Sequence, residues 1–372
     1  MSILIFLIIL AVLILVHEFG HFLLAKQAGI RVDEFGLGFP PRLFGRRKGE
    51  TMYSINAIPF GGFVKIFGED PSEEARSGPD AARSFINRPR ATQAAVLGAG
   101  VVFNLLFAWI LLTVAFTSGM PASVGFAEGL PVTDERVVIT SVLPGSSAER
   151  AGLTSGDIIR AIDATDALTD AVSVETLQQF IAARGGEKLL LTYERDGVVQ
   201  QASVIPTVFA PETTGEDGAL ARPIIGITMD LIGEVALPLH LAAVASARLT
   251  FELPGRIAVG LGELVAGSLR GTADFSEVAG PVGIVGLVRE AAQFGFVSLL
   301  SFTAFISLNL AVINLLPFPA LDGGRLLFVG IEALKRSPLS PRIANTANTV
   351  GFALLILLML AVTYNDVARL LH

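Results

Sequence analysis

Four apolar stretches constrain most strongly how this chain can fold. They cover residues 2–25, 94–117, 298–316 and about 349–364, and a helix that crosses a bilayer needs about 20 apolar residues. Hydrophobic residues make up 52% of the chain and charged residues only 16%, a balance unlike that of an ordinary soluble protein. We therefore predict an α-helical membrane protein with four transmembrane helices.

The first apolar stretch could instead be a secretory signal peptide. Such a peptide begins with a basic region and ends at a cleavage site of small residues. Here no Lys or Arg precedes Lys26, and no such site follows the apolar run. We therefore expect residues 2–25 to be retained as a membrane span.

Basic residues are distributed unevenly between the segments that connect these stretches. Residues 26–92 and 317–348 hold 15 Lys and Arg in 99 residues, whereas residues 118–297 hold 11 in 180, together with 22 Asp and Glu. Lys and Arg concentrate in cytoplasmic loops, so we expect the first two segments to be cytoplasmic. Segment 118–297 and both chain termini are then extracytoplasmic.

A compact α+β domain is predicted over residues 133–208. Strand patterns cover 137–144, 156–163, 188–194 and 198–206, a helix pattern covers 174–183, and residues 195–197 provide a hairpin turn. The run PGSSAERAGLTSGDII at 144–159 resembles the matching segment of bacterial PDZ domains. Such domains bind chain termini or extended peptides by adding a strand to a sheet edge. A small β domain without a ligand is the alternative, and only one such domain is found.

Three ionisable residues, His17, Glu18 and His21, interrupt the first apolar stretch. Helical residues four apart point about 40° from one another, so both imidazoles can bind one metal ion while Glu18 faces an open coordination position. This is the HExxH pattern of zinc peptidases. Zinc there lowers the pKa of a bound water, and the carboxylate takes the proton. Ionisable groups inside a span are costly unless paired or metal-bound, which favours a metal site over an interfacial His/Glu cluster.

The depth of His17 in the membrane limits where a third ligand can lie. A helix that begins at residue 2 places His17 15 residues along, which is about 22 Å into an apolar layer of about 30 Å. The metal site is then nearer the cytoplasmic face. Asp322, at the cytoplasmic end of the third stretch, is the candidate at that depth, although an ordinary Asp-Gly turn would explain it equally well.

Helix-breaking residues surround Asp322. Pro317 and Pro319 are predicted to end the helix of the third stretch, and Gly323 and Gly324 to let the backbone turn. Irregular backbone at membrane depth is tolerated where it lines a site. The break is therefore consistent with a site at Asp322.

Together these motifs resemble the site-2 protease family of intramembrane zinc metalloproteases, of the bacterial type that releases sigma-E. The resemblance covers HEFGH (17–21), GLGF (36–39), PFGGFVKIFGED (59–70), AGPVGI (279–284) and SLNLAVINLLPFPALDGG (307–324), as well as the PDZ segment and the last apolar stretch. It implies that Asp322 is the third zinc ligand and that Asn314 contacts substrate near the scissile bond. The enterobacterial relative carries a tandem pair of PDZ domains, whereas this chain shows one.

The resemblance also implies a function and a location. We expect one zinc ion per chain, and hydrolysis of peptide bonds within transmembrane segments of single-span proteins in the bacterial inner membrane. The substrates would be proteins already trimmed on their extracytoplasmic side, such as an anti-sigma factor, or signal-peptide remnants. The lipid bilayer and a peptide or chain terminus at the PDZ domain are the other expected partners, and no nucleic acid is expected.

Residues 50–67 (ETMYSINAIPFGGFVKIF) alternate like a pair of strands, with the break at Pro59 and Gly61-Gly62. The resemblance places this segment as a re-entrant β element in the membrane. A helical substrate hides its amides in its own hydrogen bonds, and an exposed strand edge would offer replacement partners. We therefore predict Gly61 and Gly62, together with Asn314 and Pro317, as substrate-binding residues. A plain cytoplasmic hairpin is the alternative.

Two other functions are consistent with parts of the sequence. A transporter or proton relay could use the buried ionisable residues, but it predicts inverted repeats, and the sequence shows none. A PDZ scaffold with an inactive site would show damage at Glu18 or Asp322, and both are intact. Of the remaining polar residues, Asn104 could hydrogen-bond between helices or touch the site, and we favour the first role. His240 is expected to be a surface or packed residue.

The predicted domain organisation follows from these segments. Residues 1–132 hold the first two spans with the HExxH site and the cytoplasmic loop, and residues 133–208 form the PDZ-like domain. Residues 209–297 form a connecting segment, extracytoplasmic and peripheral to the membrane. Residues 298–372 hold the last two spans with the LDG motif.

Overall fold

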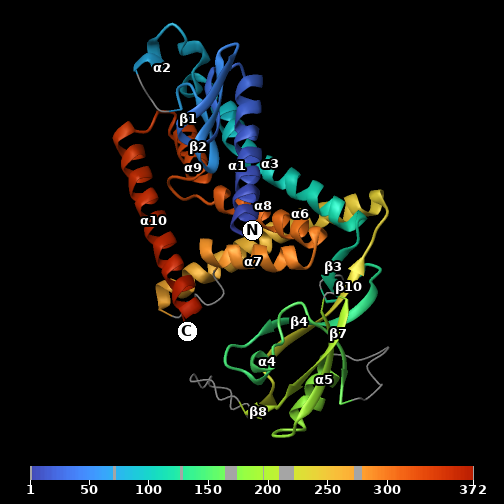
Figure 1. Ribbon diagram of the computed structural model, residues 1–372. Helices are drawn as coiled ribbons and strands as arrows, with labels where there is room; N and C mark the ends of the chain where they lie inside the picture. The colour runs from blue at the N-terminus through green and yellow to red at the C-terminus, as the bar shows by residue number, and fades with distance from the viewer. Residues whose placement is uncertain are drawn as a thin grey trace. The chain divides into compact units, whose positions relative to one another are not determined.

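The computed structural model describes residues 2–69, 73–125, 129–163, 174–195, 197–208, 222–271 and 279–371. It consists of two compact units (Figure 1). The first comprises Met1–Val114, Leu239–Ala292 and Leu299–His372, and the second comprises Ala115–Pro238 and Gln293–Ser298. The four-domain division of the chain stays a prediction.

Among the described residues, four helices are long and apolar enough to cross a membrane. They are α1 (Ser2–Gln27), α3 (Arg90–Thr117), α8 (Phe296–Leu315) and α10 (Pro341–Leu371). They match the four predicted apolar stretches, although α8 ends one residue before the end of the third, so the four predicted helices are confirmed. The last begins eight residues earlier than its apolar stretch, because Pro341 is acceptable in the first helical turn, where its missing N–H would have had no partner.

Strands β1 (Val32–Lys48) and β2 (Thr51–Ile66) form a sheet that packs along α1 (Figure 1). Residues 34–37 pair on one side with 62–65 and on the other with 52–55, and residues 42–48 pair with 51–56. The two strands therefore fold into four adjacent segments. Both halves of the predicted segment 50–67 are extended, and Gly61, at φ +94°, lies at the predicted break. The halves do not pair with each other, because part of β1 lies between them.

The first unit also contains further helices, from 3 to 32 residues long. They are α2 (Glu73–Ser77), the 3₁₀ helices η1 (Ala81–Arg83) and η2 (Phe85–Asn87), α6 (Leu239–Arg270), α7 (Pro281–Gln293) and α9 (Asp322–Lys335). A buried cluster that includes Ala25, Val32, Leu97 and Val329 joins α1, the sheet, α3 and α9. These four elements carry or surround the predicted site, so apolar packing holds them at one place.

The second unit is built on a six-stranded sheet. Its order is β3 (Met120–Ser123), β10 (Ile227–Val235), β4 (Thr133–Val142), β5 (Ile158–Ile162), β6 (Leu189–Arg195) and β7 (Val198–Val204). Helices α4 (Ser147–Arg150) and α5 (Val174–Ala182) and the short pair β8 (Thr207–Val208) and β9 (Pro223–Ile224) complete it. Ile139, Leu177 and Leu191 lie in its core. The predicted strands and helix are confirmed.

Two strands of this sheet come from outside the predicted 133–208 segment. β3 precedes it and β10 follows it, and β10 pairs with both β3 and β4. The compact unit is therefore longer than the predicted domain. At the predicted hairpin turn, Arg195 pairs with Val198, while Asp196 lies outside the described residues. Residues 209–221 and 272–278 of the predicted connecting segment lie outside them as well.

Candidate metal centre

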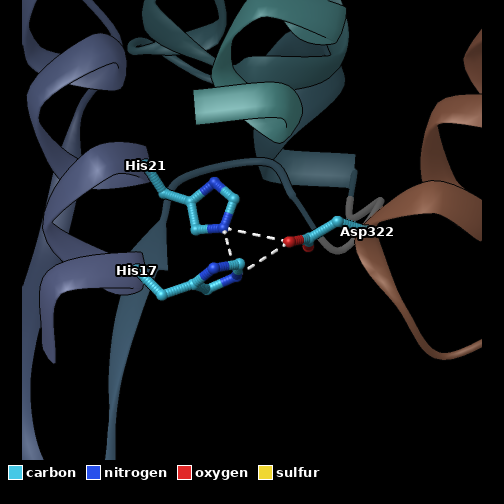
Figure 2. Close-up of side chains that lie close together, drawn as sticks. All are labelled: His17, His21 and Asp322. Carbon is cyan, nitrogen blue, oxygen red and sulfur yellow. Dashed lines mark hydrogen bonds and ion pairs between the residues drawn. The ribbon is translucent and has the colours of Figure 1, made fainter. Parts of the chain in front are cut away.

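Helix α1 places His17 and His21 one turn apart on the same face, and Asp322, the first residue of α9, approaches them from the opposite side (Figure 2). Both imidazoles are buried. His17 Nε2 lies 2.9 Å from Asp322 Oδ2, and His21 Nε2 lies 3.2 Å from that oxygen and 3.2 Å from His17 Nε2. The structure thus brings the three predicted ligands together.

The spacing of these three atoms fits zinc. A tetrahedral zinc ion with bonds of about 2.0–2.1 Å holds its ligand atoms about 3.3 Å apart. The three atoms here lie 2.9 to 3.2 Å apart, so they need to separate only slightly. Two imidazoles and one carboxylate are ligands that zinc prefers, and three protein ligands leave the fourth position open, as in catalytic sites.

The connection from α8 to α9 sets the position of Asp322. Helix α8 ends at Leu315, two residues before Pro317 and four before Pro319, as the prolines predict. The chain then reverses at Ala320, which has a left-handed φ of +77°. Asp322 follows at the start of α9, with its carboxylate directed at the histidines (Figure 2).

Gly323 and Gly324 act differently from the prediction. Both lie in the first turn of α9 and neither has a positive φ, so they do not make the turn. A Cβ on Gly323 would lie 2.2 Å from the carbonyl oxygen of Leu316, and one on Gly324 would lie 2.2 Å from that of Phe318. The glycines therefore leave room for the preceding loop to pack against the helix that carries Asp322.

Two ion pairs dock α9 on the rest of the first unit. Arg325 pairs with Glu69 at the end of the sheet, and Glu332 pairs with Arg90 of α3 at 2.8 Å. All four side chains are at least partly buried, which strengthens such pairs relative to surface ones. The pairs therefore help to hold Asp322 against α1.

Helices α1 and α3 approach closely at two glycines. A Cβ on Gly20 would lie 2.5 Å from the carbonyl oxygen of Ala99, and one on Gly100 would lie 2.5 Å from His21 Nε2 and 2.7 Å from His17 Nε2. A side chain at Gly100 would thus occupy the metal site. Sequence reasoning missed Gly100, although small residues inside a span are a known signal of close helix contact.

Each imidazole is also bonded at its second nitrogen. His21 Nδ1 lies 2.8 Å from the carbonyl oxygen of Val96, and His17 Nδ1 lies 3.1 Å from Asn104 Nδ2. Such partners orient metal-binding histidines. Asn104 therefore touches the site, which is the alternative that the sequence analysis did not favour. Its amide also bonds between helices, as expected, since Asn104 is on α3 and His17 is on α1. The backbone carbonyl of Asn104 accepts a hydrogen bond from Ser307 Oγ of α8 at 2.8 Å.

Glu18 lies between the metal site and the sheet. Its Oε2 accepts a hydrogen bond from the backbone N–H of Val64 at 3.1 Å. Gly62 is next to it, since a Cβ there would lie 4.0 Å from Glu18 Cγ, and Gly61 packs on Ile14 of the same helix. The two predicted substrate-binding glycines therefore lie beside the predicted base.

The other predicted residues lie on α8, in the loop that follows it and on α6. Asn314 is half-buried in the last turn of α8, and Pro317 is exposed in the following loop. Their contact with substrate stays a prediction. His240 is exposed on α6, in agreement with the predicted surface position.

Comparison with known proteins identifies the family. The family model of Peptidase family M50 matches residues 5–358. The chain belongs to Peptidase family M50. A putative zinc metalloprotease of Nostoc sp. is 36% identical over 96% of this chain and 93% of that protein, and one of Clostridium perfringens is 35% identical over 95% of each. The regulator of sigma-W protease RasP of Bacillus subtilis is 29% identical over 98% of each chain.

Membership in family M50 confirms the resemblance to the site-2 proteases. The chain is a zinc metalloprotease, and zinc is its cofactor. With its four membrane-length apolar helices, it is an intramembrane enzyme. A crystal structure of the PDZ domain of the SdrC-like protein from Listeria monocytogenes matches 27% of this chain and 93% of that chain, at 24% identity and a TM-score of 0.21. The PDZ assignment of the second unit stays a prediction.

Proposed function

We propose that this enzyme hydrolyses peptide bonds within transmembrane segments of single-span proteins, with zinc bound by His17, His21 and Asp322 and with Glu18 as the catalytic base. The main support is the convergence of three ligand atoms within 3.2 Å of one another. His17 and Asp322 are 305 residues apart in sequence, so tertiary packing has brought them to one point. Unpaired, these groups would be costly inside a span.

The reaction combines zinc with a positioned carboxylate. When bound, zinc lowers the pKa of a water molecule and polarises the scissile carbonyl. Glu18 takes a proton from the attacking water and delivers it to the leaving amide nitrogen. The bond from Val64 orients this carboxylate through Oε2.

The sheet provides a place for an unwound substrate. In the four-segment order, residues 62–66 form an outer segment, and its Val64 is bonded to Glu18. A substrate strand added at this edge would pair its freed amides with the protein and lie beside the base. Exposed apolar side chains of the sheet, among them Phe39, Phe44 and Ile58, support its proposed position inside the membrane as a re-entrant element.

The proposed orientation places the zinc site toward the cytoplasmic side, and the second unit and both termini outside. It is supported by the basic-residue counts and by an ionic cluster near the C-terminal end of α1, where Lys26 and Arg83 both bond to Glu50. The name of the Bacillus subtilis relative, a regulator of sigma-W protease, supports a regulatory substrate such as an anti-sigma factor. Signal-peptide remnants are the alternative substrate.

Metal content and cleavage, measured on the same preparations, test the proposed site. His17→Ala and Asp322→Ala should each lose bound zinc and cleavage of a model transmembrane substrate. His240→Ala, which changes an exposed histidine of α6, is the matched control and should keep both. Zinc at wild-type levels in His17→Ala would show that the ligands have been misassigned.

A further inference from the structure

We infer that Asn104 is a positioning residue that directs the lone pair of His17 Nε2 toward zinc, an inference that rests on the proposed metal site. Asn104 is completely buried in α3, and its amide Nδ2 lies 3.1 Å from His17 Nδ1. Its Oδ1 is buried and has no hydrogen-bond partner among the described residues. An orphan buried carbonyl is unusual and calls for a functional explanation.

The two histidines differ in what holds their second nitrogen. His21 Nδ1 faces the backbone carbonyl of Val96 at 2.8 Å, and a carbonyl can only accept. His21 must therefore carry its hydrogen on Nδ1, which leaves a lone pair on Nε2 for the metal. The partner of His17 is a carboxamide, which can donate from one end and accept at the other. Asn104 thus leaves either tautomer of His17 open.

Zinc coordination selects one of these tautomers. A neutral imidazole that coordinates through Nε2 has its hydrogen on Nδ1 and must donate it. The amide nitrogen of Asn104 cannot accept that hydrogen, but a half-turn of the amide brings Oδ1 into its place. Oδ1 is the unpaired amide atom before the half-turn and Nδ2 after it, so the turn loses no hydrogen bond overall. His17 Nδ1–H gains Oδ1 as an acceptor.

A hydrogen bond from α8 holds the backbone of α3 in place at Asn104. The backbone carbonyl oxygen of Asn104 accepts this bond from Ser307 Oγ at 2.8 Å, and Ser307 is itself completely buried on α8. Helices α1, α3 and α8 therefore meet at Asn104. Because the backbone is held, the amide can turn about its own side-chain bond without shifting away from His17.

Zinc affinity of the purified full-length protein tests the inference without reference to activity. Bound zinc is measured by elemental analysis over a series of chelator-buffered zinc concentrations. Asn104→Leu keeps much of the volume but removes the acceptor, and should weaken zinc binding by about 10- to 100-fold. Asn104→Asp restores an acceptor for Nδ1–H and should keep or exceed wild-type affinity.

One control variant separates the amide from helix packing. Asn309→Leu makes the same substitution on α8, where the amide donates to the carbonyl of Phe305 in its own helix. This variant should bind zinc as the wild type does. If Asn104→Leu does not fold, Asn104→Ala carries the same expectation without added volume.

The possible results are distinct. Wild-type zinc affinity in folded Asn104→Leu would overturn the inference, and so would an equal loss in the Leu and Asp variants, since that would show an effect of packing and not of the acceptor. His17→Ala tests the site itself. If His17→Ala binds zinc normally, the ligand assignment fails, whereas an effect of His17→Ala without one of Asn104→Leu removes only the role of Asn104.

Discussion

The backbone N–H of Val64 donates a hydrogen bond to the carboxylate of Glu18 at 3.1 Å, although 46 residues separate them. This bond connects the sheet to the HExxH helix at its one acidic residue. Val64 is in the outer segment of the sheet. The proposed base and the proposed substrate-binding edge are therefore bonded directly, so a shift of the sheet edge should also shift the carboxylate of Glu18.

Glu18→Gln tests the base without disturbing the ligands. Glutamine keeps the shape of the side chain and can still accept from Val64, but it cannot take a proton. We expect zinc content near that of the wild type and a loss of cleavage of at least about 100-fold, the scale of general acid–base catalysis. Zinc analysis and a gel-based cleavage assay measure the two effects. Normal cleavage by this variant would refute the catalytic assignment.

Gly100→Ala tests the space beside the metal ligands. The added Cβ would lie within 2.7 Å of both histidine rings, so the rings must move. A misplacement of about 1 Å in a catalytic site costs on the order of 100-fold in rate, and zinc affinity should fall as well. Gly98→Ala is the matched control, since a Cβ there meets nothing within 4 Å. Equal activity in the two variants would contradict the described packing of α3 on the site.

Topology can be tested because the chain has no cysteine. Single cysteines at Ser77 and Ser203, which are exposed in the first and second units respectively, report the two proposed sides. An impermeant maleimide added to intact spheroplasts should label Ser203→Cys alone, and Ser77→Cys should react only after the membrane is opened. Labelling of both from one side would rule out the proposed orientation.

The second unit should act as a substrate filter and not in bond breaking. Removal of residues 120–235 takes out the whole sheet, whereas removal of 133–208 would leave β10 without its partner β4. We expect the deletion to keep zinc and to cleave an isolated transmembrane segment at a comparable rate. It should also cleave untrimmed substrates that the wild type rejects. A zinc-loaded deletion that cleaves neither substrate would show that this unit is needed for activation.

Glu50 gives a pH dependence of stability outside the spans. Hydrogen bonds from Lys26 and Arg83 lower the pKa of its carboxyl. A carboxyl with a lowered folded-state pKa stabilises the protein above its unfolded pKa, near the ordinary value of 4.5, and this stabilisation is lost as the pH falls further. The thermal stability of Glu50→Gln should thus be lower than that of the wild type at pH 7, and the difference should shrink below pH 4.5. A difference in thermal stability that does not change with pH would contradict the stabilising role of the Glu50 carboxylate.

Local patterns in the sequence determined much of this protein. Apolar runs long enough to span a bilayer defined the four long helices, and strand and helix periodicity defined the elements between residues 137 and 206. The spacing of His17 and His21 put two imidazoles on one helical face. These features depend on neighbours within one or two turns, so they can be read without knowledge of the fold.

The tertiary structure decided which distant residues meet. In the sequence, Gly100 and Asn104 are simply a small and a polar residue within an apolar span. Only the packing of α3 on α1 places Gly100 against both imidazoles and Asn104 against His17 Nδ1. Likewise β3 and β10 join the sheet from beyond the predicted domain because pairing depends on proximity in space. Non-local contacts of this kind leave no periodic signal in the sequence, because helix crossing and strand order are set by the packing of the whole chain.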